Sequence, residues 1–243
     1  MPSLVAMTDM IAAVRELADM ETSAASTAFV DDTELTARIN DGLKQLYTKL
    51  AEANGQDYYV LTTTALAFTS GTSLYNLPND AATGKLFWRL LGVRITDGIR
   101  WAQAEPYGWQ EEAGLLNRAV SGGVTIGEYR YRLVGTQISF LPTPKTTGHS
   151  FVLNYLPAFQ PVSGTATFDG IQGWERWAEL TAAIDLMNKE EADPSGLLAQ
   201  RAIIDEQITR MAGQRDAGRP ERIQDVRRDG LVPRRPYDWG TTV

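Results

Sequence analysis

The chain has 243 residues, of which 43% are hydrophobic and 22% are charged, a composition typical of a folded protein with one main domain. It contains no cysteine, which excludes disulfides, thiol nucleophiles and cysteine-based metal sites and fits synthesis in a reducing cytoplasm. The net charge of -7 at pH 7 disfavours stable wrapping of nucleic acid.

The N-terminal segment does not resemble a secretion signal. It lacks a basic start and carries acids at Asp9, Glu16 and Asp19. No run of about 18 apolar residues, the length that spans a bilayer, occurs in the sequence. We therefore expect no membrane partner.

Two helices are predicted in the first part of the chain, over 6–21 and 32–53. Thr8 or Asp9 is the expected cap of the first helix, and Asp31 and Asp32 open the second. Apolar residues at helical spacing are Met7, Met10, Ile11, Val14 and Leu17 in the first helix, and Leu35, Ile39, Leu43, Leu46 and Leu50 in the second.

A β-rich region is predicted over 58–158, where β-branched and aromatic residues alternate with turn signals. The expected strands are 59–68, 73–77, 86–96, 99–104, 126–134, 137–141 and 150–156, with a short helix within 105–117. The tight turns at Asp97-Gly98 and Gly135-Thr136 predict antiparallel pairing.

In the expected strand 126–134, apolar and basic residues alternate. This period of two predicts that Tyr129, Tyr131 and Leu133 point inward, toward the core. Arg130 and Arg132 are expected to point outward.

Two more helices, over 173–192 and 195–213, are predicted to form a hairpin. Asp193 and Pro194 separate them, since aspartate caps a helix and proline suits its first turn. Trp174 and Trp177 fall on the apolar face and are expected in the core. The predicted fold class is α+β: a helical bundle of the two N-terminal helices and this hairpin, with a central antiparallel β-sheet region and an extended C-terminal arm.

The predicted arm comprises residues 216–243, which contain six arginines, five acids and three prolines but few aliphatic residues. The remaining body, 1–215, keeps 17 of the 23 basic and 25 of the 30 acidic residues. This asymmetry indicates a docking segment. Its candidate partner-binding residues are Arg222, Arg227, Arg228, Arg234, Arg235, Tyr237 and Trp239.

The sequence predicts no catalytic, cofactor-binding or metal-binding residue. His149 is the single histidine and has no nucleophile at a recognisable elbow, so we interpret it as a loop residue. Paired carboxylates, which cleave sugar bonds in glycosidases, leave one enzymatic alternative open. The candidates are Glu105, Glu111, Glu112, Asp169, Glu175 and Glu179.

Four segments, in this order, resemble the phage head-to-tail adaptor family. They are DTELTARINDGLKQLYTKL (32–50), SLYNLPNDAATGKLFWRLLGVRI (73–95), YRLVGTQISFLPTPKTTGHSFVLNYLPAF (131–159) and WERWAELTAAIDLMNKEEADPSGLLAQRAIIDEQITRM (174–211). Their order and spacing carry the resemblance, because each motif also occurs elsewhere.

The resemblance implies a structural adaptor in the virion neck, with an adaptor body over 1–215 and a docking arm over 216–243. It implies a homo-oligomeric ring of twelve subunits, assembled in the host cytoplasm, which binds the portal protein and extends the DNA channel. Tail proteins, whether nozzle, tube or stopper, would attach below the ring, and genomic DNA would pass through without specific binding. No cofactor and no enzymatic activity are implied.

Two alternatives stay open. One is a tail component that cleaves peptidoglycan, because acids are plentiful and some related neck proteins are linked to this activity. The other is a tail tube or terminator protein elsewhere in the virion.

Overall fold

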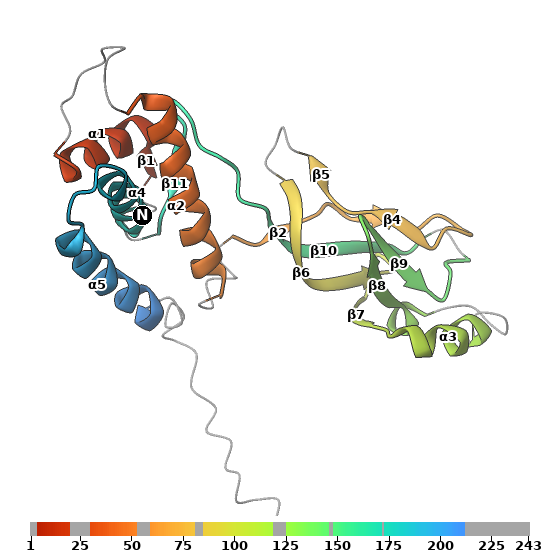
Figure 1. Ribbon diagram of the computed structural model, residues 1–243. Helices are drawn as coiled ribbons and strands as arrows, with labels where there is room; N and C mark the ends of the chain where they lie inside the picture. The colour runs from red at the N-terminus through yellow and green to blue at the C-terminus, as the bar shows by residue number, and fades with distance from the viewer. Residues whose placement is uncertain are drawn as a thin grey trace, which may run out of the picture.

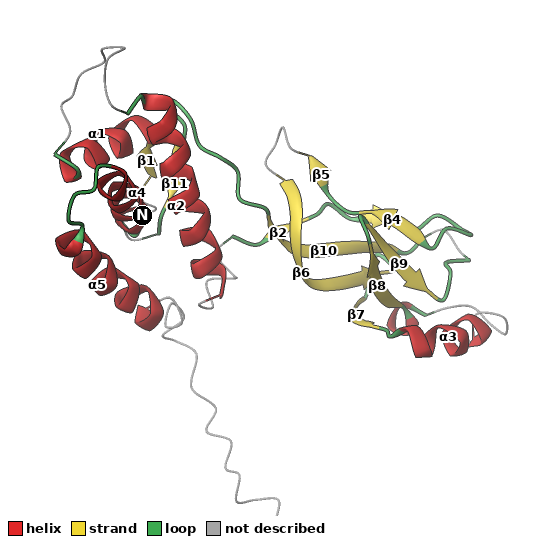
Figure 2. Cartoon of the chain, viewed as in Figure 1, coloured by secondary structure: helices red, strands yellow, loops and turns green. Residues whose placement is uncertain are grey.

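The computed structural model describes residues 4–19, 30–52, 59–80, 85–118, 125–145, 148–171 and 173–211. The fold is α+β, as predicted. In Figure 1, most of the helices gather on one side and most of the strands on the other. Figure 2 shows the same division by secondary structure, with long loops joining the helical part to the sheet.

The helical part contains α1 (Met7–Leu17), α2 (Asp32–Glu52), α4 (Glu175–Lys189) and α5 (Ser195–Met211). Helix α4 lies at its centre. Helix α4 contacts the other three and is buried on nearly every side, with Ala178, Ala182 and Ala183 among its buried residues. Trp174 and Trp177 belong to this core, as predicted. Small side chains on α4 let neighbouring backbones approach closely.

The first helix begins differently from the prediction, because neither Thr8 nor Asp9 caps it. Strand β1 (Leu4–Ala6) runs directly into α1 and pairs antiparallel with β11 (Thr167–Asp169). The amide of Met7 donates to the carbonyl of Ala166 at 3.2 Å. A distant backbone carbonyl therefore satisfies an amide at the start of the helix, and no side-chain cap is made.

The remaining strands form a nine-stranded sheet within the described residues, in the order β2-β10-β6-β7-β8-β9-β4, with β3 on β10 and β5 on β6. The strands are β2 (Leu61–Thr62), β3 (Leu66–Ala67), β4 (Leu74–Asn76), β5 (Asn79–Asp80), β6 (Lys85–Thr96), β7 (Trp101–Pro106), β8 (Arg130–Val134), β9 (Gln137–Leu141) and β10 (Ser150–Pro157). The predicted strand over 59–68 is split into β2 and β3, which both pair with β10.

The prediction of an antiparallel sheet was wrong for one pair. Strands β7 and β8 run parallel, with Glu105 opposite Arg130. A parallel return needs a long connection, and the segment between the two strands provides it with η2 (Trp109–Glu111), α3 (Glu112–Arg118) and η3 (Ile126–Glu128). Helix α3 is the short helix expected within 105–117.

The expected alternation in the predicted strand 126–134 also fails in part. The segment opens with η3, where the amide of Thr125 donates to the Glu128 carboxylate at 2.8 Å. Tyr129 is buried as predicted, but Leu133 is 41% exposed. The Arg132 side chain is only 15% exposed, because aromatic residues of the inserted segment cover it.

Among the described residues, buried side chains form two hydrophobic clusters. One lies among the helices, and the other fills the sheet around Phe68, Phe140, Phe151 and Tyr155. The rings of Phe140 and Phe151 lie 4.7 Å apart, so aromatic contacts hold this second cluster together.

Candidate functional site

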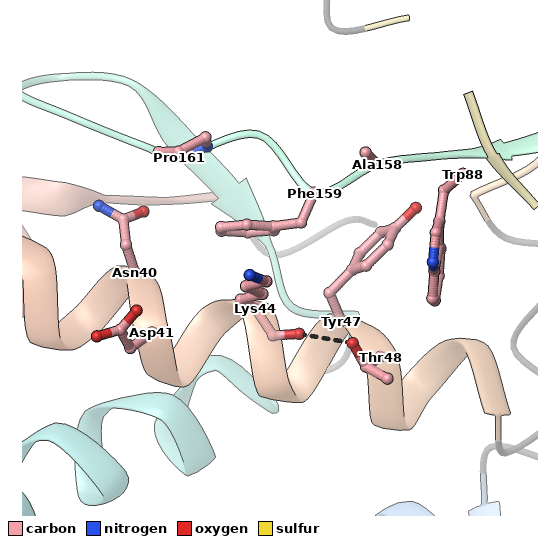
Figure 3. A pocket seen from close by; sticks show the side chains of 9 residues that line it. All are labelled: Asn40, Asp41, Lys44, Tyr47, Thr48, Trp88, Ala158, Phe159 and Pro161. Carbon is pink, nitrogen blue, oxygen red and sulfur yellow. Dashed lines mark hydrogen bonds between the residues drawn. The ribbon is translucent and has the colours of Figure 1, made fainter. Parts of the chain in front are cut away.

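A cleft of about 410 Å³ lies where the helical part meets the sheet. One wall is helix α2, and the other is the segment 158–161 that leaves β10, with Trp88 of β6 at one end (Figure 3). The lining residues are Asn40, Asp41, Lys44, Tyr47, Thr48, Trp88, Ala158, Phe159 and Pro161. A volume of this size falls within the range of peptide and small-molecule sites.

Three aromatic rings line this cleft. The Tyr47 ring centroid lies 5.7 Å from that of Trp88 and 6.1 Å from that of Phe159. Figure 3 shows the three rings beside one another along the cleft. Trp88 is 41% exposed, so its ring offers apolar surface to a ligand.

Hydrogen bonds from α2 fix the far wall of the cleft at both ends. Asn40 donates to the Val162 carbonyl at 2.9 Å and accepts from the Val162 amide at 2.7 Å. The Tyr47 hydroxyl donates to the Pro157 carbonyl at 2.7 Å. Because both ends of the 157–162 segment are tied to one helix, the cleft is preorganised.

The charges of the cleft lie on the exposed side of α2. Asp41 and Lys44 contribute one acid and one base about one helical turn apart. Burial raises the pKa of Tyr47 to about 12, so its hydroxyl stays neutral and keeps its hydrogen bond at physiological pH.

A second cluster of aromatic and charged residues lies on the sheet. The Arg132 guanidinium lies 3.4 Å from the Trp109 ring centroid and 4.9 Å from that of Tyr107. Arg132 also pairs with Glu112 at 3.1 Å. Trp109 is 73% exposed, which makes this cluster a surface feature.

The six candidate acids divide into two groups with structural contacts. On the sheet side, Glu105 pairs with Arg130, Glu112 pairs with Arg132, and Glu111 accepts the Gly108 amide at 3.0 Å.

On the helical side, Asp169 accepts the Ile171 amide at 3.0 Å, and Glu179 pairs with Arg176 at 3.0 Å. Glu175 is buried against the backbone of Gly170, where an added Cβ would lie 2.1 Å from its carboxylate. The acids therefore serve turns, strands and helices, and the glycosidase alternative gains no geometric support from these contacts.

His149 contacts the sheet core. Its Nδ1 lies 3.4 Å from the Tyr129 hydroxyl, and the two rings meet edge to face at 5.9 Å. Over the described residues, no three histidine or acidic side chains gather as a possible metal site. The same residues include no helix long and apolar enough to cross a membrane.

The predicted partner-binding residues of the arm, Arg222, Arg227, Arg228, Arg234, Arg235, Tyr237 and Trp239, lie outside the described residues. Sequence reasoning missed the cleft, because residues 40–48 and 158–161 are far apart in the chain. The sequence places residues 40–48 in the first resemblance segment and 158–159 in the third, but nothing in it brings the two segments together.

Comparison with known proteins agrees with the sequence resemblance. Curated protein sequences gave no match to the chain. The family model described as SU10 adaptor protein matches residues 6–230, which is most of the chain and includes both the helical part and the sheet. The chain therefore belongs to the SU10 adaptor protein family, a family of phage head-to-tail adaptors.

Proposed function

We propose that this chain is a structural head-to-tail adaptor in the neck of a tailed phage virion. Subunits form a ring, of twelve copies, that binds the portal protein, extends the DNA channel and offers a platform for tail proteins. The observation that carries the proposal is the family match over residues 6–230.

The charge of the body supports passage of DNA through such a ring. Residues 1–215 carry 25 acidic and 17 basic residues out of chain totals of 30 and 23. An acidic lining repels phosphates, so DNA slides through without specific binding. This role needs neither a cofactor nor a membrane.

The composition of the predicted arm supports docking on a partner. Residues 216–243 have too few aliphatic residues to build a core, so their order would come from a partner. Five of the six arginines of the arm, Arg222, Arg227, Arg228, Arg234 and Arg235, would pair with carboxylates, and Tyr237 and Trp239 would fill apolar pockets. The portal and an adjacent subunit are the two candidate partners.

Mixing the purified protein with the portal protein of the same phage tests the proposal. Electron microscopy of the mixture is expected to show a ring seated on the portal. A full-length chain that forms no complex with portal would contradict the proposal.

Deletion of 216–243 separates this function from a tail tube or terminator protein. A portal adaptor is expected to lose portal docking on deletion, whereas a tail component has no portal docking to lose. A peptidoglycan-release assay on the full-length chain checks the remaining alternative, and no release is expected.

A further inference from the structure

The aromatic cleft beside α2 has the features of a site for a proline-containing peptide. Grooves that bind such peptides are lined by aromatic rings against which the peptide packs. Trp88, which is 41% exposed, and the half-buried Phe159 supply this surface, and the largely buried Tyr47 ring packs between them. Asp41 adds an acid at the other end of the cleft.

The chain contains one segment of matching chemistry. Residues 233–236 read Pro-Arg-Arg-Pro, and Tyr237 follows them. Two prolines three positions apart favour a polyproline II conformation, which binds with little loss of entropy because it is already extended.

The distance between the two prolines matches the length of the α2 wall of the cleft. Three residues of polyproline II cover about 9 Å, the distance between Pro233 and Pro236 in that conformation. From Asp41 to Tyr47 helix α2 rises by about 9 Å, at about 1.5 Å for each residue. One proline can therefore pack near Tyr47 and Trp88 while the other lies near the Asp41 end of the cleft.

A charge pair is available at one end of the cleft. Arg234 and Arg235 lie between the prolines, and the arginine next to the proline at the Asp41 end would pair with Asp41. Lys44 lies midway along the same wall, and because neighbouring side chains of polyproline II point in different directions, the second arginine would point away from it into solvent.

The segment can reach beyond its own body. Residues 212–232 separate α5 from Pro233 and cover up to about 70 Å when extended. A compact domain of this size has a radius of gyration of only about 17 Å. A ring brings the cleft of a neighbour within this reach.

We propose that the cleft formed by α2, Trp88 and residues 158–161 binds the Pro-Arg-Arg-Pro segment of the arm from an adjacent copy. The inference rests on the proposed ring and assigns one of the two candidate partners of the arm. The arm of each subunit then binds the cleft of the next subunit, and the ring closes through this repeated head-to-tail contact.

Cysteine cross-linking tests the contact directly, because the full-length chain has no cysteine of its own. One preparation carries Thr48→Cys in the cleft. The other preparation carries a tag that makes its chain larger on a gel. It also carries either Leu231→Cys or Asp238→Cys, which lie on the two sides of the Pro-Arg-Arg-Pro segment. The two are mixed, with and without portal protein, oxidised mildly and separated on a non-reducing gel.

A mixed disulfide dimer is expected, at least tenfold more abundant than with Gln103→Cys, an exposed position on β7 that serves as control. Trp88→Ala is expected to lower the yield about tenfold, while Trp101→Ala, on another exposed tryptophan, leaves it unchanged. Asp41→Arg should lower the yield, and Arg234→Asp with Arg235→Asp in the partner should restore it.

The absence of a mixed dimer under both conditions would overturn the inference. A further preparation carries both cysteines on one chain, and a disulfide that forms only within that chain would also overturn the inference. If the chain binds portal but gives no mixed dimer, the contact between the arm and the neighbouring cleft is disproved and the adaptor function still holds. If a mixed dimer forms but the chain never binds portal, only the adaptor function is disproved.

Discussion

At the scale of single residues, polar side chains of α2 hold the helical part to the segment that leaves the sheet. Asn40 is an example, because its amide group makes both hydrogen bonds of the Val162 backbone. An asparagine inside a helix is unfavourable by propensity alone, so its contacts across the cleft explain its place. Asn40 falls within the first segment of the family resemblance, but nothing in the sequence identifies it as the partner of residue 162.

Asn40→Ala is expected to lower the free energy of unfolding by about 1–3 kcal/mol, because it leaves the Val162 amide and carbonyl without these partners. Urea denaturation followed by circular dichroism measures the change. Asn188→Ala, at an exposed position of α4, is the matched control and should change the free energy by less than about 0.5 kcal/mol. Equal effects of the two substitutions would count against the role of Asn40.

The raised pKa of Tyr47 predicts that the stability of the protein falls at alkaline pH. Its folded-state pKa is raised to about 12 by burial, above the ordinary value of 10.0. A raised pKa means that the folded state favours the neutral hydroxyl, so this stability is present below pH 10 and is lost as pH rises through 12.

Ultraviolet titration of phenolate absorbance in the folded protein checks this prediction. Tyr129, whose pKa burial also raises to about 12, should titrate together with Tyr47. Tyr47→Phe should reduce the component that titrates near pH 12. Ionisation of every tyrosine near pH 10 in the folded chain would contradict the burial of both side chains.

At the scale of elements, a close contact between two helices lies at Gly42 of α2. A Cβ atom there would lie 2.9 Å from the carbonyl oxygen of Ala178 in α4, a backbone atom that cannot turn aside. This contact lets α2 and α4 approach closely, and it joins two helices that lie far apart in the sequence.

Gly42→Ala is expected to destabilise the protein by about 1–3 kcal/mol, because overpacking outweighs the better helix propensity of alanine. Gly196→Ala in α5 is the matched control, since a Cβ there meets nothing within 4 Å. That substitution should stabilise by up to about 1 kcal/mol. Thermal denaturation distinguishes the two, and stabilisation by both would contradict the close contact.

The helices were more predictable than the strands. Their apolar stripes and local signals such as Asp193, which accepts the Ser195 amide at 3.0 Å, depend on residues near in sequence. Strands β1 and β11 have three residues each and pair with one another across the chain, so no local pattern announces them. The parallel pairing of β7 with β8 likewise depends on how the segment between these two strands packs on the rest of the protein, which no local sequence pattern reveals.

At the scale of the whole molecule, two hydrophobic clusters support two different surfaces. The helical cluster holds the α2 wall of the cleft, and the sheet cluster holds the strands next to Trp109 and Trp88. The sequence predicted the α+β class and the family, since composition and motif order are properties of the sequence itself. It did not predict the cleft, which exists only once the two parts meet.

Deletion of residues 216–243 is expected to leave the unfolding free energy of the remaining chain unchanged within about 0.5 kcal/mol. The deleted segment has few aliphatic residues to contribute to either cluster. Urea denaturation of the full-length and shortened chains checks this. A loss of several kcal/mol would mean that the arm belongs to the fold of its own subunit.

A reconstruction of the phage neck at side-chain resolution would show directly where this chain lies in the virion. A ring of this chain is expected between the portal and the tail, with the DNA channel running through it. Density for the chain at another place in the virion, or its absence from the particle, would disprove the proposed adaptor function.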